Sequence, residues 1–325
     1  MSLFPEDTVN YCCDPVSADT YKQRIKVAAK FCAERHRIYI LRHQGKPKPW
    51  TKDPILRSYR FCNIYRELDT VTEWIMDNWI NPYTDSPNIA LRAILGRVIN
   101  HPPTLKAMID TGLDLNSSFN QKLTWELFRD IRDSGEKLVT GAYIVNTIFP
   151  KDHKKIDGSK ADYIANFLLP QLWSKRKELN SGLFLGSFSS AIESMKQIHG
   201  VGGFIANQAA TDLSYTPLLS KAKDLNTTWN PGPGTTKGIR WITDKWNLKA
   251  GTEDMNKALT KYRDDLNSEL SSFPEFTSSS NQSRMKTHIV SLTAPNASNS
   301  LCELSKFVWL RLGKRERLKN TYKGS

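Results

Sequence analysis

The sequence has little that would suit an exported, disulfide-bonded or membrane-spanning protein. Its 325 residues include five cysteines, an odd number without a Cys-x-x-Cys pair, which disfavours a disulfide framework or a thiolate zinc site. No window approaches the roughly 18 uncharged apolar residues that a membrane span needs. The start of the chain lacks a basic segment followed by an apolar one. We therefore expect a soluble, cytoplasmic protein with reduced thiols.

Strand patterns and nucleotide-binding loops are also missing. Alternation of apolar and polar residues is scarce, and no repeat of roughly 20–50 residues occurs. The glycine-rich stretch 232–238 fails the Walker spacing, because Lys237 precedes Gly238 and Ile239 follows it. Gly200-x-Gly202 fails as a dinucleotide fingerprint, because Ile205 stands where the third glycine is needed. These patterns exclude a nucleotide kinase and a dinucleotide-binding protein.

Helical periodicity is what remains, and it predicts a mostly α-helical fold in a single compact domain, with few or no strands. Beyond the body of the fold we expect an N-terminal extension over 1–18, a mobile loop over 273–284 and a basic tail over 313–325. The 60–79 segment has the most regular apolar stripe, with steps of three and four. Helices are expected at 19–42, 60–79, 87–99, 103–111, 122–134, 160–178, 184–197, 204–213, 236–246, 255–270 and 300–312.

Positive charge is concentrated in two short stretches. The net charge is +13, yet residues 21–60 alone hold 12 Lys and Arg against two acids, and residues 301–325 hold seven against two. Aromatic residues lie between these charges, at Tyr39, Trp50 and Tyr59 among others. Cations that follow phosphates and rings that stack on bases are typical of nucleic-acid binding. The alternatives are a solvated basic helix and, with less support, an anionic membrane surface.

One glycine turn has a known functional counterpart. Ile198-x-Gly200-Val201-Gly202-x-x-x-Ala206 resembles the hairpin of helix-hairpin-helix DNA-binding units. In those units glycines allow a tight turn that directs backbone N–H groups at a DNA phosphate. The alternative is a plain corner between two helices.

Five blocks together resemble a family. They are Pro49-Trp50-Thr51 with Asp53, the segment from Arg60 to Asp69, Gly200 to Phe204 with Gln208 and Asp212, Gly232-Pro233-Gly234 with Lys237-Gly238, and Cys302-Glu303 with Lys306. In this order they resemble the α-glutamyl/putrescinyl thymine pyrophosphorylase family, which includes phage amino acid:DNA transferases. That family is similar to the helical domain of the 5-hydroxymethyluracil DNA kinases. Ser305 and Gly203 depart from the family pattern, which has Asp and Pro at these positions.

The resemblance implies a step in the hypermodification of thymidine in phage DNA. A separate 5-hydroxymethyluracil DNA kinase, the expected pathway partner, pyrophosphorylates the base. The family member then displaces pyrophosphate with the amine of an amino acid or polyamine. The expected partners are double-stranded DNA carrying modified thymine and the amine co-substrate, without a membrane, in the host cytoplasm. No cofactor is required by the motifs, although the pyrophosphate leaving group makes Mg²⁺ plausible.

The chemistry assigns roles to the motif residues. The modified base must leave the stack, the departing pyrophosphate needs cations, and the amine needs a base. We expect Asp69, Asp212, Glu303 and Lys306 to be catalytic, the three carboxylates as base or as holders of the ammonium group. Substrate or DNA contacts are expected from Arg60, Asn63, Arg66, Gly200, Gly202, Phe204, Gln208, Gly232, Gly234 and Lys237, and no metal ligand is assigned.

Several of these residues also have a structural explanation. Asn63 and Gln208 present the donor and acceptor needed to read uracil, and Phe61, Tyr65 or Phe204 are candidates for stacking on it. However, Phe61 also fits the core, and Asp212 could merely orient the glycine turn. Two other functions stay open: a non-catalytic helical DNA-binding module, and a helix-hairpin-helix glycosylase, although Asp212 lies closer to the turn than a glycosylase aspartate does.

Overall fold

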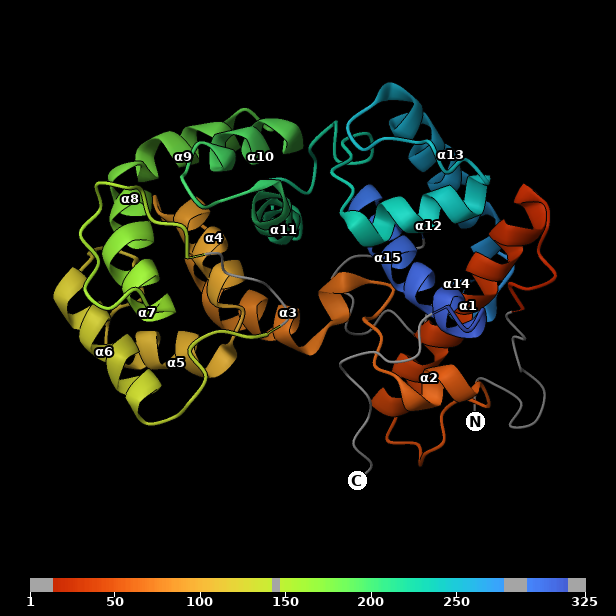
Figure 1. The fold of residues 1–325 in the computed structure, drawn as a ribbon, viewed down its shortest axis with the longest axis horizontal. Helices are drawn as coiled ribbons and strands as arrows, with labels where there is room; N and C mark the ends of the chain where they lie inside the picture. The colour runs from red at the N-terminus through yellow and green to blue at the C-terminus, as the bar shows by residue number, and fades with distance from the viewer. Residues whose placement is uncertain (1–13, 142–146, 278–290, 315–325) are drawn as a thin grey trace. The chain divides into compact units, whose positions relative to one another are not determined.

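The structure is a computed structural model that describes residues 14–141, 147–277 and 291–314. These residues form helices and connecting segments without a β-strand, which confirms the mostly α-helical fold. The chain divides into two compact units, residues 1–68 with 229–325 (unit 1) and residues 69–228 (unit 2) (Figure 1). Each unit has its own hydrophobic core. The expectation of one domain over 1–325 stays a prediction.

Unit 1 is built from both ends of the chain. Its long helices α1, α13 and α15 bury one another's apolar faces together with α12, and Phe31, Tyr262 and Phe307 lie in the resulting core. Side-chain caps set several helix starts: Thr20 and Gln23 form a capping box at α1, and Thr293 caps α15. The helices are α1 (Tyr21–His43), α2 (Pro54–Ser58), η1 (Arg66–Leu68), α12 (Pro233–Thr243), α13 (Glu253–Leu270), α14 (Pro274–Thr277) and α15 (Ala294–Arg311).

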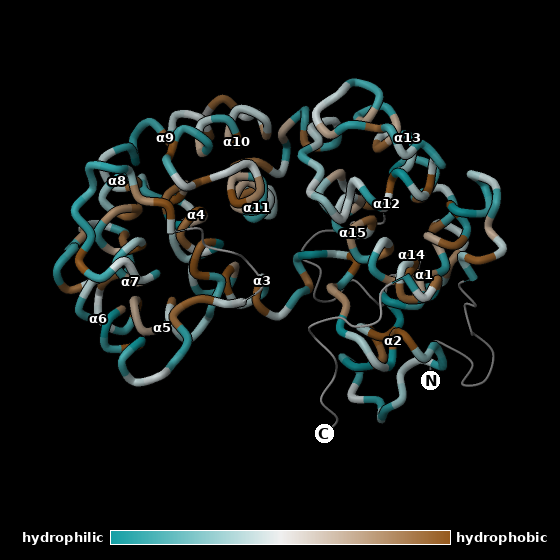
Figure 2. Tube along the Cα trace, in the orientation of Figure 1, coloured by the Kyte–Doolittle hydropathy of each residue, from teal (hydrophilic) through white to brown (hydrophobic). Residues whose placement is uncertain are grey.

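Unit 2 is arranged around α4 (Ile89–Ile99), all eleven residues of which are buried. Helices α5, α8, α9 and α11 contact α4 (Figure 1). Hydrophobic and hydrophilic segments alternate along the helices of both units, as amphipathic packing requires (Figure 2). The other helices of unit 2 are α3 (Thr70–Ile75), η2 (Met76–Ile80), η3 (Asn81–Tyr83), α5 (Pro102–Asp110), α6 (Gln121–Asp133), α7 (Lys160–Asp162), η4 (Tyr163–Leu168), α8 (Leu169–Ser174), α9 (Arg176–Phe184), α10 (Phe188–Lys196) and α11 (Gly203–Ser214).

Two helix predictions are wrong. Residues 60–79 do not form one helix, because the segment before η1 is irregular and α3 begins only at Thr70. The break expected between the helices at 160–178 and 184–197 is also misplaced, since residues 179–184 lie inside α9 and the chain turns at 185–187. The glycine turn and the helix after it are confirmed, as are the helices at 19–42 and 87–99 within two residues at each end.

The expected flanking segments lie largely outside the described residues. Of the N-terminal extension, residues 14–18 are described, and Ala18 is buried in the core of unit 1. The first part of the expected loop, up to Thr277, contains the short helix α14, whereas 278–284 lies outside the described residues. Of the basic tail only Gly313 and Lys314 are described.

Candidate functional site

The polar face of α15 holds the irregular segment 60–65. Asn299 Nδ2 donates to the Asn63 carbonyl (2.9 Å). Glu303 Oε2 accepts from the Cys62 N–H (3.0 Å). Asn299 and Glu303 are four residues apart, so they share a helix face. Backbone groups that a helix would pair internally are therefore satisfied by side chains of α15, which explains why this segment is not helical.

An ion pair lies at the C-terminal end of this face. Lys306 Nζ is 3.2 Å from Glu303 Oε2, also donates to the Arg60 carbonyl, and lies 4.3 Å from the centroid of the Phe61 ring. The Lys306 and Glu303 side chains are only 21% and 10% exposed, so water screens the pair weakly. Beside it, the Arg60 and Cys62 side chains are exposed. Two of the predicted motifs therefore lie side by side. One provides the Glu303 carboxylate and the Lys306 ammonium group, and the other provides the exposed Arg60.

Helix α12 packs on a neighbouring face of α15. A methyl group at Gly234 would lie 2.4 Å from Cys302 Sγ, and one at Gly238 would lie 2.5 Å from the Leu301 carbonyl oxygen. These two glycines therefore let the helices approach closely. Gly232 is the N-cap of α12, and Lys237 is exposed on the same helix. The glycine motif at 232–238 therefore also packs against α15.

Two predicted residues lie where the chain passes between the units. Arg66 is buried in η1, and its backbone N–H donates to Asn296 Oδ1 (3.1 Å). Asp69 is the half-buried N-cap residue of α3. The buried Asn63 side chain donates to the Leu68 carbonyl (2.6 Å), which fixes the turn that precedes Asp69. Arg66 and Asp69 are therefore not members of one α-helix.

The glycine turn of unit 2 joins α10 to α11. Gly200 has φ +89°, and a methyl group there would meet the hydroxyl of Tyr163, which is 1% exposed. Gly202 is the N-cap of α11, with φ −76° and open space where a side chain would be. Phe204 is 51% exposed, whereas Gln208, one turn further, is buried. The glycines therefore form a tight turn between two helices, as the sequence predicts, and this geometry fits both a helix-hairpin-helix unit and a plain corner.

Asp212 lies at the far end of α11 from this turn. It is fully buried and forms a bidentate pair with Arg97 of α4, with Nε to Oδ2 at 2.5 Å. Arg97 also donates to Thr72 Oγ1 (3.0 Å) and Asn100 Oδ1 (3.1 Å). These contacts link α11 to α4 and to α3. The arrangement favours a structural role for Asp212, and its catalytic role stays a prediction.

Of the three candidates for stacking on a base, only Phe204 is exposed. Phe61 packs edge-on against Phe31 at 5.8 Å between centroids, and Tyr65 packs against His36 at 5.1 Å. Both Phe61 and Tyr65 are buried in the core of unit 1. The structural explanation of Phe61 is therefore confirmed.

The predicted residues thus fall into two groups. In unit 1, the motif residues lie on α15, on the segment that α15 holds, or at α12, which packs against α15: Arg60, Asn63, Arg66, Gly232, Gly234, Lys237, Glu303 and Lys306. Unit 2 holds the others: Asp69, Gly200, Gly202, Phe204, Gln208 and Asp212. The prediction missed Asn296 and Asn299, whose spacing with Glu303 and Lys306 forms a polar stripe on an amphipathic helix. It also missed Arg97, although an arginine in the apolar segment 89–99 is a signal of a buried partner.

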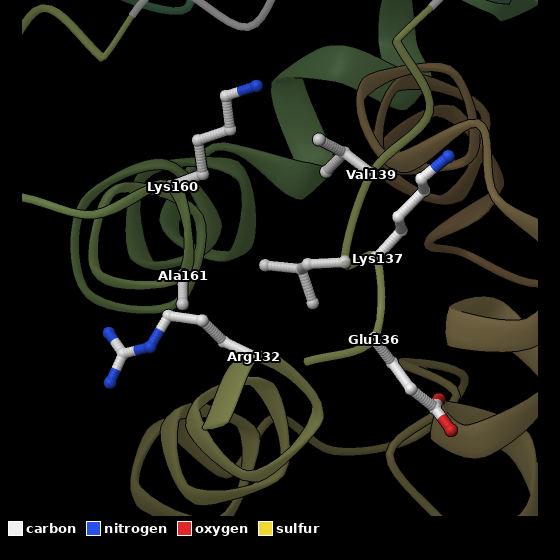
Figure 3. Close-up of a pocket in the computed structure, with 7 residues that line it drawn as sticks. Arg132, Glu136, Lys137, Val139, Lys160 and Ala161 are labelled. Carbon is white, nitrogen blue, oxygen red and sulfur yellow. The ribbon is translucent and has the colours of Figure 1, made fainter. Parts of the chain in front are cut away.

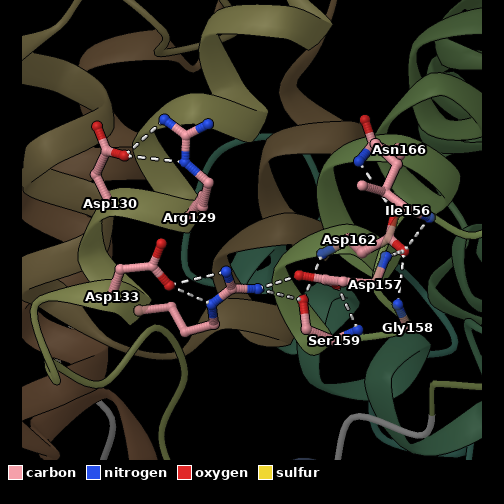
Figure 4. Close-up of polar contacts among 10 residues, drawn as sticks. Arg129, Asp130, Asp133, Ile156, Asp157, Gly158, Ser159, Asp162 and Asn166 are labelled. Carbon is pink, nitrogen blue, oxygen red and sulfur yellow. Dashed lines mark hydrogen bonds and ion pairs between the residues drawn. The ribbon is translucent and has the colours of Figure 1, made fainter.

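A small pocket of about 310 Å³ in unit 2 lies away from these residues, between the end of α6 and the start of α7 (Figure 3). Its cations include Arg132, which is paired with Asp133 (2.8 Å) and Asp157 (Figure 4). The pocket is lined by Arg132, Glu136, Lys137, Leu138, Val139, Lys160 and Ala161. None of the predicted site residues lines it, and acids already neutralise its guanidinium.

Beside this pocket a buried carboxylate organises the loop before α7. Asp162 Oδ2 accepts from the N–H groups of Ile156 (2.8 Å), Asp157 (3.0 Å) and Gly158 (2.9 Å) (Figure 4). Burial acts to raise the pKa of Asp162, but these bonds and one from Asn166 hold that pKa below its ordinary value. Asp162 is therefore a charged structural anchor.

Within the described ranges, no group of three or more His, Cys, Asp and Glu side chains could hold a metal ion, so a role for Mg²⁺ stays open. No helix among these residues is long and apolar enough to cross a membrane.

Comparison with known proteins places these features in context. Residues 22–316 match the family model for "5-hmdU DNA kinase, helical domain". The chain is 30% identical over 255 residues to a "5-hmdU DNA kinase" of Bacillus phage SP10. The aligned residues make up 73% of this chain and 38% of the relative. The aligned region thus spans well under half of that relative's length. No solved structure matches.

Proposed function

The chain belongs to the helical-domain family of the 5-hmdU DNA kinases, and from this premise we propose that it is a DNA-modifying transferase. It acts on 5-(pyrophosphoryloxymethyl)uracil in phage DNA, replaces pyrophosphate with the amine of an amino acid or polyamine, and takes the base out of the helix to do so. It works after a 5-hydroxymethyluracil DNA kinase. The proposal adds a specific reaction to the link with phage thymine hypermodification that the family match supports.

The observation that carries the proposal is the meeting of three motifs on α15. Lys306, Glu303 and the exposed Arg60 lie on or beside one polar face, next to the glycine-packed helix α12 with Lys237. Displacement of pyrophosphate requires cations near a leaving group that carries several negative charges, and a carboxylate that takes a proton from the co-substrate's ammonium group so that the free amine can attack. Unit 1 provides both kinds of group within one helix turn of each other.

In the reaction, the amine nitrogen forms a bond to the 5-methylene carbon while the bond from that carbon to the pyrophosphate oxygen breaks. The pyrophosphate leaves with the electron pair, and its charge is stabilised by Lys306, Arg60 and Lys237. Glu303 accepts the proton that the amine loses. The ion pair with Lys306, 3.2 Å from Oε2, holds the Glu303 carboxylate beside the cation that faces the leaving group.

Two glycine-capped helices support binding of phosphate groups. Gly202 and Gly232 cap α11 and α12 without a side-chain hydrogen bond to the first turn. At both positions a methyl group would meet no atom of the described residues within 4 Å, so packing among them does not explain the glycines. Glycine at a helix start allows a phosphate to approach the backbone N–H groups and the positive end of the helix dipole. We assign Gly202 to the DNA backbone and Gly232 to the pyrophosphate.

A non-catalytic DNA-binding module is the second candidate. The observation that favours it is the engagement of Asp212, one of the four expected catalytic residues, in a buried pair with Arg97. The helical-domain description of the matching family is compatible with this alternative as well.

The experiment offers DNA containing 5-(pyrophosphoryloxymethyl)uracil and a mixture of amino acids and polyamines, and then identifies the digested nucleosides by mass spectrometry. The transferase predicts amino-linked thymidine. Unchanged nucleosides with a folded, DNA-bound protein would indicate the binding module, and abasic sites would indicate the glycosylase. Lys306→Ala should abolish the product and leave DNA binding within about threefold, whereas Lys257→Ala, in an exposed pair with Glu253, should retain activity.

A further inference from the structure

Two tryptophans of unit 1 form a stacked pair at the surface. Trp246, which follows α12, and Trp309 of α15 have ring centroids 5.9 Å apart and ring planes within 5° of parallel. Trp246 is 50% exposed although one of its faces lies over Trp309. Large aromatic surface left in water costs free energy. An exposed pair of parallel tryptophan rings is therefore a candidate binding surface.

The orientation of Trp246 is fixed by its neighbours. Its indole Nε1 donates to Asp244 Oδ1 (3.3 Å). Asp244 ends α12 in the left-handed conformation, with φ +57°, and is paired with Arg24 of α1 (3.3 Å). A ring held in this way loses little further conformational entropy when a flat ligand stacks on it.

Three lysines and one acid, Asp244, lie within three residues of Trp246 or against the Trp309 ring. Lys245, Lys249 and Lys314 are exposed, and Lys314 Nζ lies 5.4 Å from the Trp309 ring. In the part of the chain that is described, these three lysines have no ion-pair partner, whereas the nearby Asp244 is neutralised by Arg24. The surface therefore joins flat aromatic rings to unpaired cations, which is the combination that binds single-stranded nucleic acid.

We propose that the Trp246–Trp309 pair is a stacking platform for an unpaired nucleobase of DNA, with Lys245, Lys249 and Lys314 contacting the adjacent phosphates. Bases in a duplex have both faces covered by their neighbours, so only a single strand or a locally opened site can occupy the platform. The occupant is a nucleic acid because its bases match the rings and its phosphates match the lysines, and the proposed function makes it DNA. This inference rests on the proposed function only for the choice of DNA as the partner.

The test measures binding of two labelled single strands of about a dozen residues, one of thymidine and one with the same phosphates but abasic sugars. Wild-type protein should bind the thymidine strand roughly 5- to 150-fold more tightly. Trp246→Ala should remove most of this difference, and Trp246→Phe, which keeps a ring, should retain most of it. Leu185→Ala, at a 72% exposed apolar residue of unit 2, is the matched control and should change nothing.

Equal binding of the two strands by wild-type protein, or an undiminished preference in Trp246→Ala, would overturn the platform. If Trp246→Ala fails to fold, a 5-iodouracil strand cross-linked to wild-type protein decides the question, since the cross-link should map to Trp246 or Trp309 and mapping elsewhere contradicts the inference. A self-association that Trp246→Ala abolishes while strand binding is unchanged would identify a second copy as the occupant instead. Unmodified DNA is used without an amine, so these outcomes are independent of transfer activity.

Discussion

At the scale of single residues, the glycines of the motifs fall into two kinds. Gly200 and Gly234 are required by the fold, because one has a positive φ and the other leaves no room for a methyl group beside Cys302. Gly202 and Gly232 have negative φ values and open surroundings, so another requirement must explain them. The sequence predicts all four as binding residues, since only the structure shows what a Cβ would meet.

We expect Gly200→Ala to destabilise the protein by about 1–2 kcal/mol or more, because alanine in the left-handed region is strained and its methyl group collides with Tyr163. Gly202→Ala should cost less than about 1 kcal/mol and should instead weaken binding of duplex DNA. Urea denaturation and a DNA-binding titration measure the two effects. Equal stability losses in both variants would contradict this division of roles.

His36 should make unit 1 sensitive to acid. It is buried among Tyr39, Tyr65 and Phe276. This burial, with the nearby charge of Arg35, lowers its pKa to about 3 from 6.5. Because the folded-state pKa is below the unfolded-state pKa, the unfolded state takes up the proton first. Stability is therefore full above pH 6.5 and is lost as the pH falls towards 3.

Between pH 7.5 and pH 5 this histidine should lower the free energy of unfolding by about 2 kcal/mol. His36→Phe retains a ring in the core and removes a buried ring nitrogen, Nδ1, that has no hydrogen-bond partner among the described residues. The variant should lose less stability than wild type over the same interval, as measured by urea denaturation at each pH. Parallel pH profiles would show that His36 does not contribute.

At the scale of elements, the 60–79 segment shows where periodicity fails as a guide. Its apolar stripe is real, since Ile64 and Trp79 are both fully buried, but the two residues lie in the cores of different units. The chain changes unit near Asp69, and the steps of three and four continue across that point by coincidence. No local pattern indicates that α15, more than 220 residues later, satisfies the backbone of Cys62 and Asn63.

The Arg97–Asp212 pair should be a structural link between α4 and α11. Asp212→Asn removes a charge and leaves Arg97 buried without its counterion, which should cost about 3–5 kcal/mol. The matched control is Asp110→Asn, whose partner Lys106 lies in an exposed pair and whose loss should cost under about 1 kcal/mol. Thermal and urea unfolding measure both variants. A stable Asp212→Asn protein that has lost transfer activity would instead identify Asp212 as catalytic.

At the scale of the whole molecule, the basic stretch of the sequence corresponds to a charged surface of the structure. Lys22, Lys26 and Lys30 lie four residues apart on α1, are exposed, and have no ion-pair partner among the described residues. Their spacing places them on one face of the helix. The division into two units was not predictable in the same way, because a helical pattern carries no mark of which core it enters.

Neutralising Lys22, Lys26 and Lys30 to Gln should weaken binding to any DNA sequence. It should also make the dependence of log K on log salt less steep by up to about 3, since each lost phosphate contact contributes about 0.9. Removing the same number of charges at Lys106, Lys257 and Lys261, which are all paired with acids, is the control and should change the slope by less than about 1. Equal slopes in the two triple variants would show that DNA does not contact this face of α1.

The sequence indicates only those residues of the candidate site that belong to a motif. Motif blocks contain Glu303, Lys306, Arg60 and Lys237. The structure places the first three on or beside α15, and Lys237 lies on α12, which packs against α15. The residues that hold the site together, such as Asn299, form ordinary hydrogen bonds to backbone groups distant in the sequence. Such contacts follow from packing and have no local signature.

The most direct test of the central claim is the release of pyrophosphate from DNA carrying 5-(pyrophosphoryloxymethyl)uracil, measured with and without an amine. We predict amine-dependent release, with one amino-linked thymidine formed for each pyrophosphate, and loss of both products in Glu303→Gln and Lys306→Ala. No release by a folded, DNA-bound wild-type protein across all amino acids and polyamines would contradict the account.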